Sequence, residues 1–184
     1  MDEAQPGGVT MGLLNWCYSM MFEAIGGEGG MVGHVAGKGL MAMFGAPLPL
    51  PDHCDAAVRT ALEMIELMTL FNAERRTSGK PEIRIGIGIA SGEMVAGYTG
   101  TNERATYTCI GDTVNLASRP EAHTKAAERT ILIADATRTG KRTSLATEAL
   151  GPAPLSGHSP ADHVFAAQGG QRRARSVVGG PRPR

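Results

Sequence analysis

The side chains that could bind a metal ion or carry acid–base chemistry are few in this sequence. Asp52, His53, Cys54 and Asp55 form a consecutive run of metal-capable residues. Consecutive residues at the start of a helix point in different directions, so this run does not predict a metal site. Helix capping and compensation of the helix dipole account for the two aspartates. Elsewhere we find no Ser/His/Asp arrangement and no phosphate-binding loop, and the histidines in the C-terminal third show no metal-ligand spacing.

Glycine and cysteine spacing argue against two further kinds of site. Gly86, Gly88 and Gly92 match part of a dinucleotide-binding pattern, but they lie in an alternating strand pattern that leads into another strand, not a helix. The three cysteines are far apart and lack C-x-x-C spacing. This arrangement favours buried thiols over a disulfide framework or a structural zinc site.

Hydrophobic periodicity predicts the elements of the N-terminal half. Residues 13–25 carry apolar side chains at three- and four-residue spacing, which predicts an amphipathic helix that ends at a pair of glycines. Two apolar runs at 31–35 and 40–44, separated by Gly-Lys-Gly, predict a strand hairpin. Asp52 is expected to cap a second helix that ends near Asn72.

The C-terminal half is predicted to be richer in strands. The isoleucines at 83, 85, 87 and 89 alternate with small or polar residues, which predicts a strand, and residues 94–98 are expected to return as the next one. Further strands are expected at 107–110, 131–134 and 162–166, with helices at 113–127 and 137–150. This order predicts an α+β fold in which helices pack against a mostly antiparallel sheet.

Length and composition predict one globular domain, because 42% of the 184 residues are hydrophobic and 20% are charged. Eighteen basic residues balance eighteen acidic ones, so charge does not favour a nucleic-acid or membrane partner. No apolar run is long enough to cross a bilayer, and the acidic start is untypical of a secretion signal. We therefore expect a cytoplasmic protein with a disordered lead-in at 1–12, a folded domain at 13–167 and a disordered basic tail at 168–184.

Three sequence blocks carry a family resemblance. Residues 30–47 read GMVGHVAGKGLMAMFGAP, residues 84–97 read RIGIGIASGEMVAG, and residues 100–119 read GTNERATYTCIGDTVNLASR. In this order and at these separations, the blocks resemble the catalytic domain of class III nucleotide cyclases, the adenylate and guanylate cyclases. The resemblance covers most of the chain.

The resemblance implies a ferredoxin-like nucleotide cyclase fold of the α+β class, and a dimer whose active sites draw residues from both subunits. It also implies phosphorus–oxygen lyase chemistry. In that family the ribose 3′-hydroxyl of the nucleotide attacks the α-phosphate, which converts ATP to cyclic AMP and pyrophosphate. Two Mg²⁺ or Mn²⁺ ions, held by two aspartates, support this step.

Both aspartates of the family pattern are absent from their expected places. The first belongs to a strand ahead of the helix that starts near residue 13, but the residues there, Asp2 included, show no such strand pattern. The second belongs to a Gly-Asp turn, where this sequence has Lys38. An ammonium group at that turn repels divalent cations. We therefore expect an N-terminally incomplete cyclase domain that holds no metal cofactor.

Four residues stand at positions with nucleotide roles in the family. Asn115 and Arg119 match the pair that orients the ribose and stabilises charge on the α-phosphate, and their four-residue spacing puts them on one helix face. The alternative for this pair is a solvated polar helix face. Thr108 matches the purine-reading position. His34 stands where adenine-specific members carry a lysine, and its imidazole can still donate a hydrogen bond to a purine.

Three functions stay open at this point. The first is a cyclase homologue that is inactive or severely impaired as a homodimer. The second is a heterodimer subunit that supplies Asn115 and Arg119 to an intact cyclase. The third is a non-enzymatic module that binds a purine nucleoside triphosphate or another protein. In all three, the loss of a first strand would expose a sheet edge to pairing with another chain.

Overall fold

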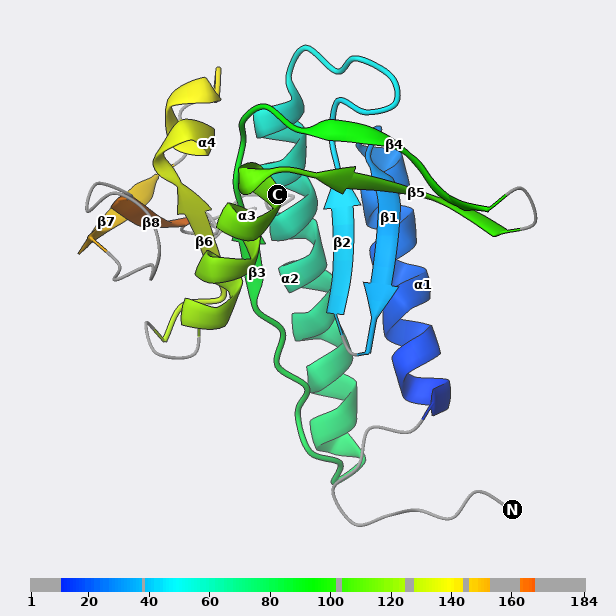
Figure 1. Ribbon diagram of the computed structural model, residues 1–184. Coiled ribbons are helices and arrows are strands. Elements are labelled where there is room, and N and C mark those ends of the chain that lie inside the picture. Colours follow the sequence, from blue (N-terminus) through cyan, green and yellow to red (C-terminus); the bar gives the residue numbers. More distant parts are fainter. Residues whose placement is uncertain are drawn as a thin grey trace, which may run out of the picture.

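The computed structural model describes residues 11–37, 39–101, 104–124, 128–143, 146–152 and 163–167. Lys38, most of the predicted lead-in and the predicted tail lie outside this description. Figure 1 shows the elements in chain order, which are α1 (Met11–Gly27), β1 (Met31–Ala36), β2 (Gly39–Met43), α2 (His53–Thr77), β3 (Ile87–Ile89), β4 (Val95–Thr101), β5 (Arg104–Ile110), α3 (Asp112–His123), β6 (Ile131–Ala134), α4 (Asp135–Gly140), β7 (Thr147–Pro152) and β8 (His163–Ala167).

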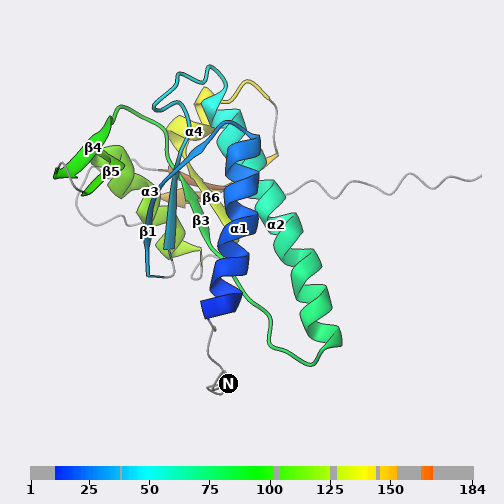
Figure 2. The ribbon, with the colours of Figure 1, turned by 90° about the vertical axis from the view of Figure 1, so that its right-hand side faces the viewer.

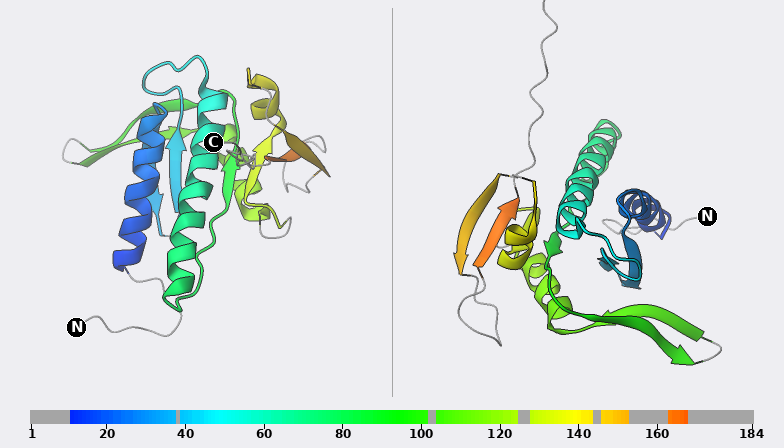
Figure 3. Two further views of the ribbon diagram at one scale, coloured as in Figure 1. Left: turned by 180° about the vertical axis from the view of Figure 1, so that it is seen from behind. Right: turned by 90° about the horizontal axis from the view of Figure 1, so that it is seen from above.

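Two long helices form the backing layer of the fold. α1 and α2 lie side by side, and the hairpin β1–β2 and the segment that contains β3 lie across one face of the pair (Figures 1 and 2). α3, α4 and strands β6 to β8 gather beside β3. The hairpin β4–β5 extends away from β7 and β8 (Figure 3). No described helix is long and apolar enough to span a membrane.

The strands form one four-stranded sheet and two hairpins within the described residues. The larger sheet has the order β3-β6-β8-β7, in which β3 and β6 are parallel and the other pairs are antiparallel. In the hairpins, Met31 lies opposite Met43 and Val95 lies opposite Ile110. The prediction of an α+β fold with mostly antiparallel pairing is confirmed.

The prediction of one long strand over residues 83–89 is wrong for its first half. Only β3 pairs, with β6, while the backbone of Ile83 both donates to and accepts from the side chain of Asn72, at 2.9 and 2.8 Å. The strand predicted at 94–98 forms at Val95–Thr101, but this strand, β4, pairs with β5 and not with β3. An alternating pattern predicts an extended backbone and does not say which neighbour completes its hydrogen bonds.

The predicted N-cap of α2 is right in position and wrong in mechanism. Asp52 precedes the helix, yet its side chain makes no capping hydrogen bond. It pairs with Arg59 at 2.9 Å, and that hydrogen bond lowers the pKa of the Asp52 carboxyl. Arg59 also reaches Glu28 at 2.7 Å. The helix runs to Thr77, beyond the predicted end, and Gly79 follows with a φ of 66°.

The predicted helix over residues 137–150 is wrong beyond its first turn. α4 ends at Gly140, and β7 follows as a partner of β8. A Cβ on Gly140 would lie 2.8 Å from Cys54 Sγ, so a close approach to α2 requires glycine here. Next, the carboxylate of Asp55 accepts the backbone N–H groups of Arg142 and Thr143, which holds this segment out of a helix.

Two apolar clusters form the core of the described residues. One joins α2 to the four-stranded sheet through Val58, Ala61, Ile89, Ile131 and Ile133. The other joins α1 to α2 through Ala24, Ile25 and Met64, with the hairpin β1–β2 packed against it. All four residues of β6 are buried, as the apolar run at 131–134 predicts.

Candidate functional site

The predicted base-contacting residues come from strands that lie side by side. His34 is exposed in β1 and lies opposite Met41 of β2. The sulfur of Met41 is 3.9 Å from Cys109 Sγ in β5, and β1 and β5 are in contact. Thr108 directly precedes Cys109, so the structure brings the backbone positions of His34 and Thr108 into one region.

Thr108 is half-buried in β5 and pairs with Gly97 of β4. Since successive strand residues point to opposite faces, Thr108 points away from the face on which Cys109 meets Met41. Burial raises the pKa of the Cys109 thiol, so this sulfur is an apolar packing group rather than a nucleophile. Of these two neighbours, Thr108 therefore offers the group that can hydrogen-bond to a ligand, its hydroxyl.

The start of α3 is fixed by contacts that the sequence pattern does not reveal. The hydroxyl of Thr113 donates to the backbone carbonyl of Glu93 at 2.8 Å. A Cβ on Gly92 would lie 2.7 Å from Thr113 Oγ1, so the loop approaches the helix this closely only with glycine. Gly111, with a φ of 154°, turns the chain from β5 into α3. Together these contacts set the direction of the helix that carries Asn115.

Asn115 lies on the exposed face of α3, while its neighbour Val114 is half-buried against the domain. Among the described residues, the amide side chain of Asn115 has no hydrogen-bond partner; its backbone carbonyl accepts the hydroxyl of Ser118 at 2.8 Å. Arg119 follows one helical turn later on α3, but its side chain lies outside the described part. An exposed amide on this face can donate to and accept from a ligand.

The part of the chain that the structure describes contains no candidate for the divalent metal site that the family resemblance implies. In the described part of the chain, no three His, Cys, Asp or Glu side chains converge. The run at 52–55 diverges as predicted: His53 Nδ1 contacts the carbonyl of Leu50, Cys54 contacts Ser91, and Asp55 binds backbone N–H groups. Lys38, between the ends of β1 and β2, brings no oxygen ligand to that turn.

Known proteins resemble this chain in both sequence and fold. The family model described as "Adenylate and Guanylate cyclase catalytic domain" matches residues 2–167. Adenylate cyclase 1 of Rhizobium meliloti is 31% identical over 171 residues, which cover 93% of this chain and 26% of that protein. The chain thus spans about a quarter of that curated relative.

Solved structures agree with the family model. The adenylyl cyclase CyaB from P. aeruginosa superposes with a TM-score of 0.80 at 26% identity, over 92% of this chain and 87% of that one. The guanylate cyclase domain of RhGC from Catenaria anguillulae, solved in complex with GTP, superposes with a TM-score of 0.72 at 27% identity, over 91% and 89% of the two chains.

Proposed function

This chain belongs to the adenylate and guanylate cyclase catalytic domain family, and from that premise we propose that it is a cyclic-nucleotide signalling domain that forms no cyclic nucleotide on its own. The observation that carries the proposal is Lys38, which stands between β1 and β2 in the sequence, at the position where the family pattern has a metal-binding aspartate. A lysine ammonium repels the divalent ions on which attack at the α-phosphate depends.

Binding of a purine nucleoside triphosphate is part of this proposal. Thr108 and His34 lie on contacting strands, and each side chain has a group that can hydrogen-bond to a nucleotide. One structural relative is solved with GTP, which supports a nucleotide of this class. We expect this binding to be weak, since the turn that carries basic triphosphate contacts in the family reads Leu-Ser-Gly-His at 155–158, outside the described residues.

The exposed amide of Asn115 favours a second candidate function, a subunit that completes the site of an intact cyclase. On α3, Asn115 faces outward and makes no side-chain hydrogen bond to any described residue, while Arg119 follows one turn later. A group that must reach a nucleotide held by another subunit has to be exposed in the isolated chain. Asn115 meets that condition.

A surface for the other subunit is available on the hairpin β4–β5. Val95 and Ile110 lie opposite each other and are 76% and 69% exposed, and Tyr98 is 79% exposed against the ring of Tyr107. These two pairs lie on opposite faces of the hairpin, because Val95 and Tyr98 are three residues apart in β4. Exposed apolar side chains on one protruding element favour an interaction surface there. We propose that this hairpin contributes to pairing with a second cyclase domain.

Two assays test the proposals separately. The purified chain with ATP or GTP and Mn²⁺ should form no cyclic nucleotide above background, and robust formation would contradict the first proposal. In the second assay the chain is mixed with a competent cyclase domain whose own residues equivalent to Asn115 and Arg119 are alanine. Restored activity supports the subunit role, and its absence at saturating concentrations rejects that role.

A further inference from the structure

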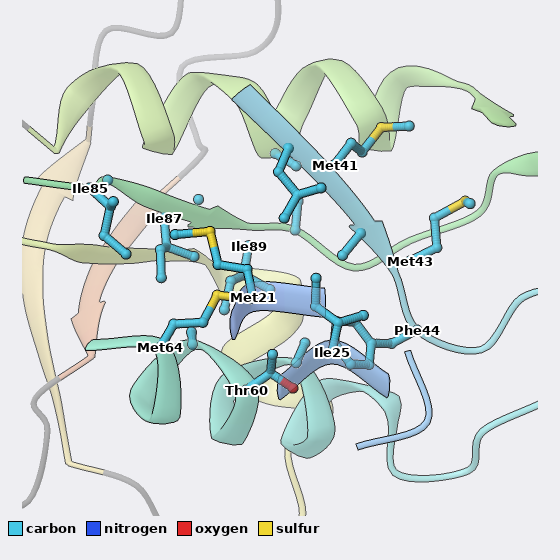
Figure 4. A pocket seen from close by; sticks show the side chains of 18 of the residues that line it. Met21, Ile25, Met41, Met43, Phe44, Thr60, Met64, Ile85, Ile87 and Ile89 are labelled. Atoms are coloured by element: carbon cyan, nitrogen blue, oxygen red, sulfur yellow. The ribbon is translucent and has the colours of Figure 1, made fainter. Parts of the chain in front are cut away.

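Two pockets of the described structure differ in their lining. Methionine and isoleucine side chains of the core, among them Met21, Met64 and Ile87, line a hollow of about 1750 Å³ (Figure 4). They carry no charge with which to recognise a small polar ligand. A separate surface pocket of about 270 Å³ is lined by Leu13, Trp16, Phe71, Glu74, Arg75, Ser78 and Lys80. The candidate nucleotide residues lie on other elements, so this second pocket is independent of the proposed function.

The second pocket, here called the α1–α2 pocket, has an aromatic wall. α1 and α2 run antiparallel, so the first turns of α1 lie beside the last turns of α2 (Figure 2). The indole of Trp16 stacks on the ring of Phe71, with centroids 3.9 Å apart and planes inclined by 28°. Trp16 remains 42% exposed, so part of its surface is open to a ligand. Such a surface favours a planar apolar partner that stacks on it.

Three charged side chains line the same pocket. Glu74 is exposed in the last turn of α2, Lys80 is exposed on the loop that follows, and Arg75 is half-buried. Arg75 Nε donates to the carbonyl of Pro81 at 2.7 Å, and the guanidinium carbon lies 5.5 Å from the centre of the Phe71 ring. These two contacts hold the guanidinium beside the aromatic wall.

The opposite charges of the pocket are not paired with each other. Within the described ranges, neither the carboxylate of Glu74 nor the ammonium of Lys80 forms an ion pair, although both line a pocket of only about 270 Å³. The neighbouring Arg76 does not line the pocket and is paired with Glu82 at 2.6 Å. A negative and a positive group that stay apart across a small pocket are complementary to a ligand that carries both charges.

We propose that the α1–α2 pocket binds a free α-amino acid with an aromatic side chain. The carboxylate of this ligand pairs with Arg75 and Lys80, its ammonium group pairs with Glu74, and its ring stacks on the open indole surface of Trp16. A ligand with the carboxylate alone would be repelled by Glu74, and a ligand with the ammonium alone would be repelled by the two cations. Drug-sized ligands occupy about 300–1000 Å³, so this pocket takes only a small molecule.

The first test uses the full chain and L-phenylalanine. Trp16 is the only tryptophan of the sequence, so its fluorescence, excited where phenylalanine does not absorb, reports on the pocket wall. We expect a saturable change with a dissociation constant on the order of 1 mM or below. L-Alanine has both charges and no ring, and it should bind about tenfold more weakly or less. No saturable change at tenfold higher concentrations, or equal binding of the two amino acids, overturns the proposal.

Two analogues that each lack one charge test the arrangement of the charges. Hydrocinnamate has the ring and the carboxylate without the ammonium group, and phenethylamine has the ring and the ammonium without the carboxylate. Each should bind about threefold or more weakly than L-phenylalanine. Equal binding of hydrocinnamate would identify a simple anion site, and equal binding of phenethylamine would identify a simple cation site. Both results contradict the proposal.

Substitutions assign each charge of the ligand to a side chain. Glu74→Gln should weaken binding of L-phenylalanine about threefold or more and should not weaken binding of hydrocinnamate, because only the ammonium group loses its partner. By the same reasoning, Lys80→Met should weaken binding of L-phenylalanine and not that of phenethylamine. Glu66→Gln is the control, since Glu66 is exposed on α2 and does not line the pocket. All three side chains are exposed, so the melting temperature should stay the same. Equal losses for the amino acid and its analogue would overturn the proposal.

One further result would assign the pocket to this chain itself. Residues 1–10 precede α1, on which Leu13 and Trp16 lie. If L-phenylalanine binds only after residues 1–10 are deleted, that segment occupies the pocket and the proposal is overturned. Equal binding to the full and the shortened chain supports a free amino acid as the ligand.

Discussion

The carboxylate of Asp55 accepts the backbone N–H of Arg142 at 2.8 Å, across 87 residues of chain. A second hydrogen bond, from the N–H of Thr143 at 3.0 Å, completes the pair. Asp55 is only 5% exposed. Burial opposes its ionisation, but these hydrogen bonds outweigh that effect and lower the pKa of the carboxyl. One side chain thus holds the start of α2 against the segment that leads from α4 to β7.

Asp55→Asn should destabilise the chain by about 2 kcal/mol, because an amide offers one oxygen to two buried donors and turns its own N–H₂ toward one of them. The check is the free energy of unfolding in urea at neutral pH. Asp52→Asn is the matched control: Asp52 is more exposed and its partner is the side chain of Arg59, so its loss should be smaller. Equal effects at both positions would contradict the role given to Asp55.

The lowered pKa of Asp55 also predicts an acid dependence. A carboxyl whose pKa is lower in the folded state contributes its full stabilisation above the unfolded-state pKa, near 4, and loses it as the pH falls through the folded-state value. Unfolding free energies between pH 3 and pH 6 should therefore fall less steeply toward acid in Asp55→Asn than in the native chain. The same pH dependence of the unfolding free energy in both proteins would contradict the lowered pKa of Asp55.

The close approach of Gly92 to Thr113 predicts coupling between them. Gly92→Ala should cost about 1–3 kcal/mol, since its Cβ would lie 2.7 Å from Thr113 Oγ1. Thr113→Ala should cost about 1 kcal/mol through its lost bond to Glu93. In the double variant the alanine at position 92 meets no hydroxyl. The loss of unfolding free energy in the double variant should therefore be smaller than the sum of the two single losses. Additive losses would show that the contact does not set the start of α3.

Asn115→Ala should separate function from stability. Asn115 is exposed and its amide has no hydrogen-bond partner in the described part of the chain, so its loss should change the unfolding free energy by less than about 0.5 kcal/mol. In the mixing assay with the altered cyclase domain, the same change should reduce restored activity by about 100-fold. Ser118→Ala, on the same helix, is the control and should retain most of it. Equal restored activity in both variants would show that Asn115 is not part of the site.

Lys38→Asp should leave the isolated chain inactive with ATP or GTP and Mn²⁺. This change restores one carboxylate of the two that the family pattern contains, and a two-metal site with half its ligands does not hold its ions in place. Cyclic nucleotide is measured by chromatography, with the native chain as the reference. Clear activity from this single change would contradict the proposed loss of the first aspartate.

Lysines on the hairpin β4–β5 should weaken association with another cyclase domain. Val95→Lys combined with Ile110→Lys places two charges on a cross-strand pair that is largely exposed. Sedimentation velocity should show at least tenfold weaker association, with an unchanged melting temperature. Leu70→Lys is the control, because Leu70 is 70% exposed on α2. Loss of association in the control as well would point to a general effect of charge.

Helices and strands that depend on the spacing of nearby residues could be predicted from the sequence. Apolar spacing places α1 and α2, and the run at 131–134 predicts the buried strand β6. The pairing of the strands could not be predicted, because the alternation of apolar residues at 83–89 is the same whichever strand lies beside β3. The end of α4 depends on Cys54 and Asp55, which are distant in sequence, so no local signal at 140–143 reveals it.

The sequence motifs name candidate site residues but do not reveal the contacts that support them. The motifs point to Asn115, Thr108 and His34, which the structure places on α3, β5 and β1. The contact of Gly92 with Thr113 depends on packing between elements. Sequence spacing carries no information on such contacts, since they form between residues far apart in the chain.

The two ion pairs of Arg59 bracket the hairpin β1–β2, because Glu28 precedes β1 and Asp52 follows β2. The Arg59 side chain is 47% exposed, so dissolved salt screens both pairs. The apolar contacts of the core are not screened in this way. Ionic strength therefore acts selectively on how firmly the hairpin is held to α2.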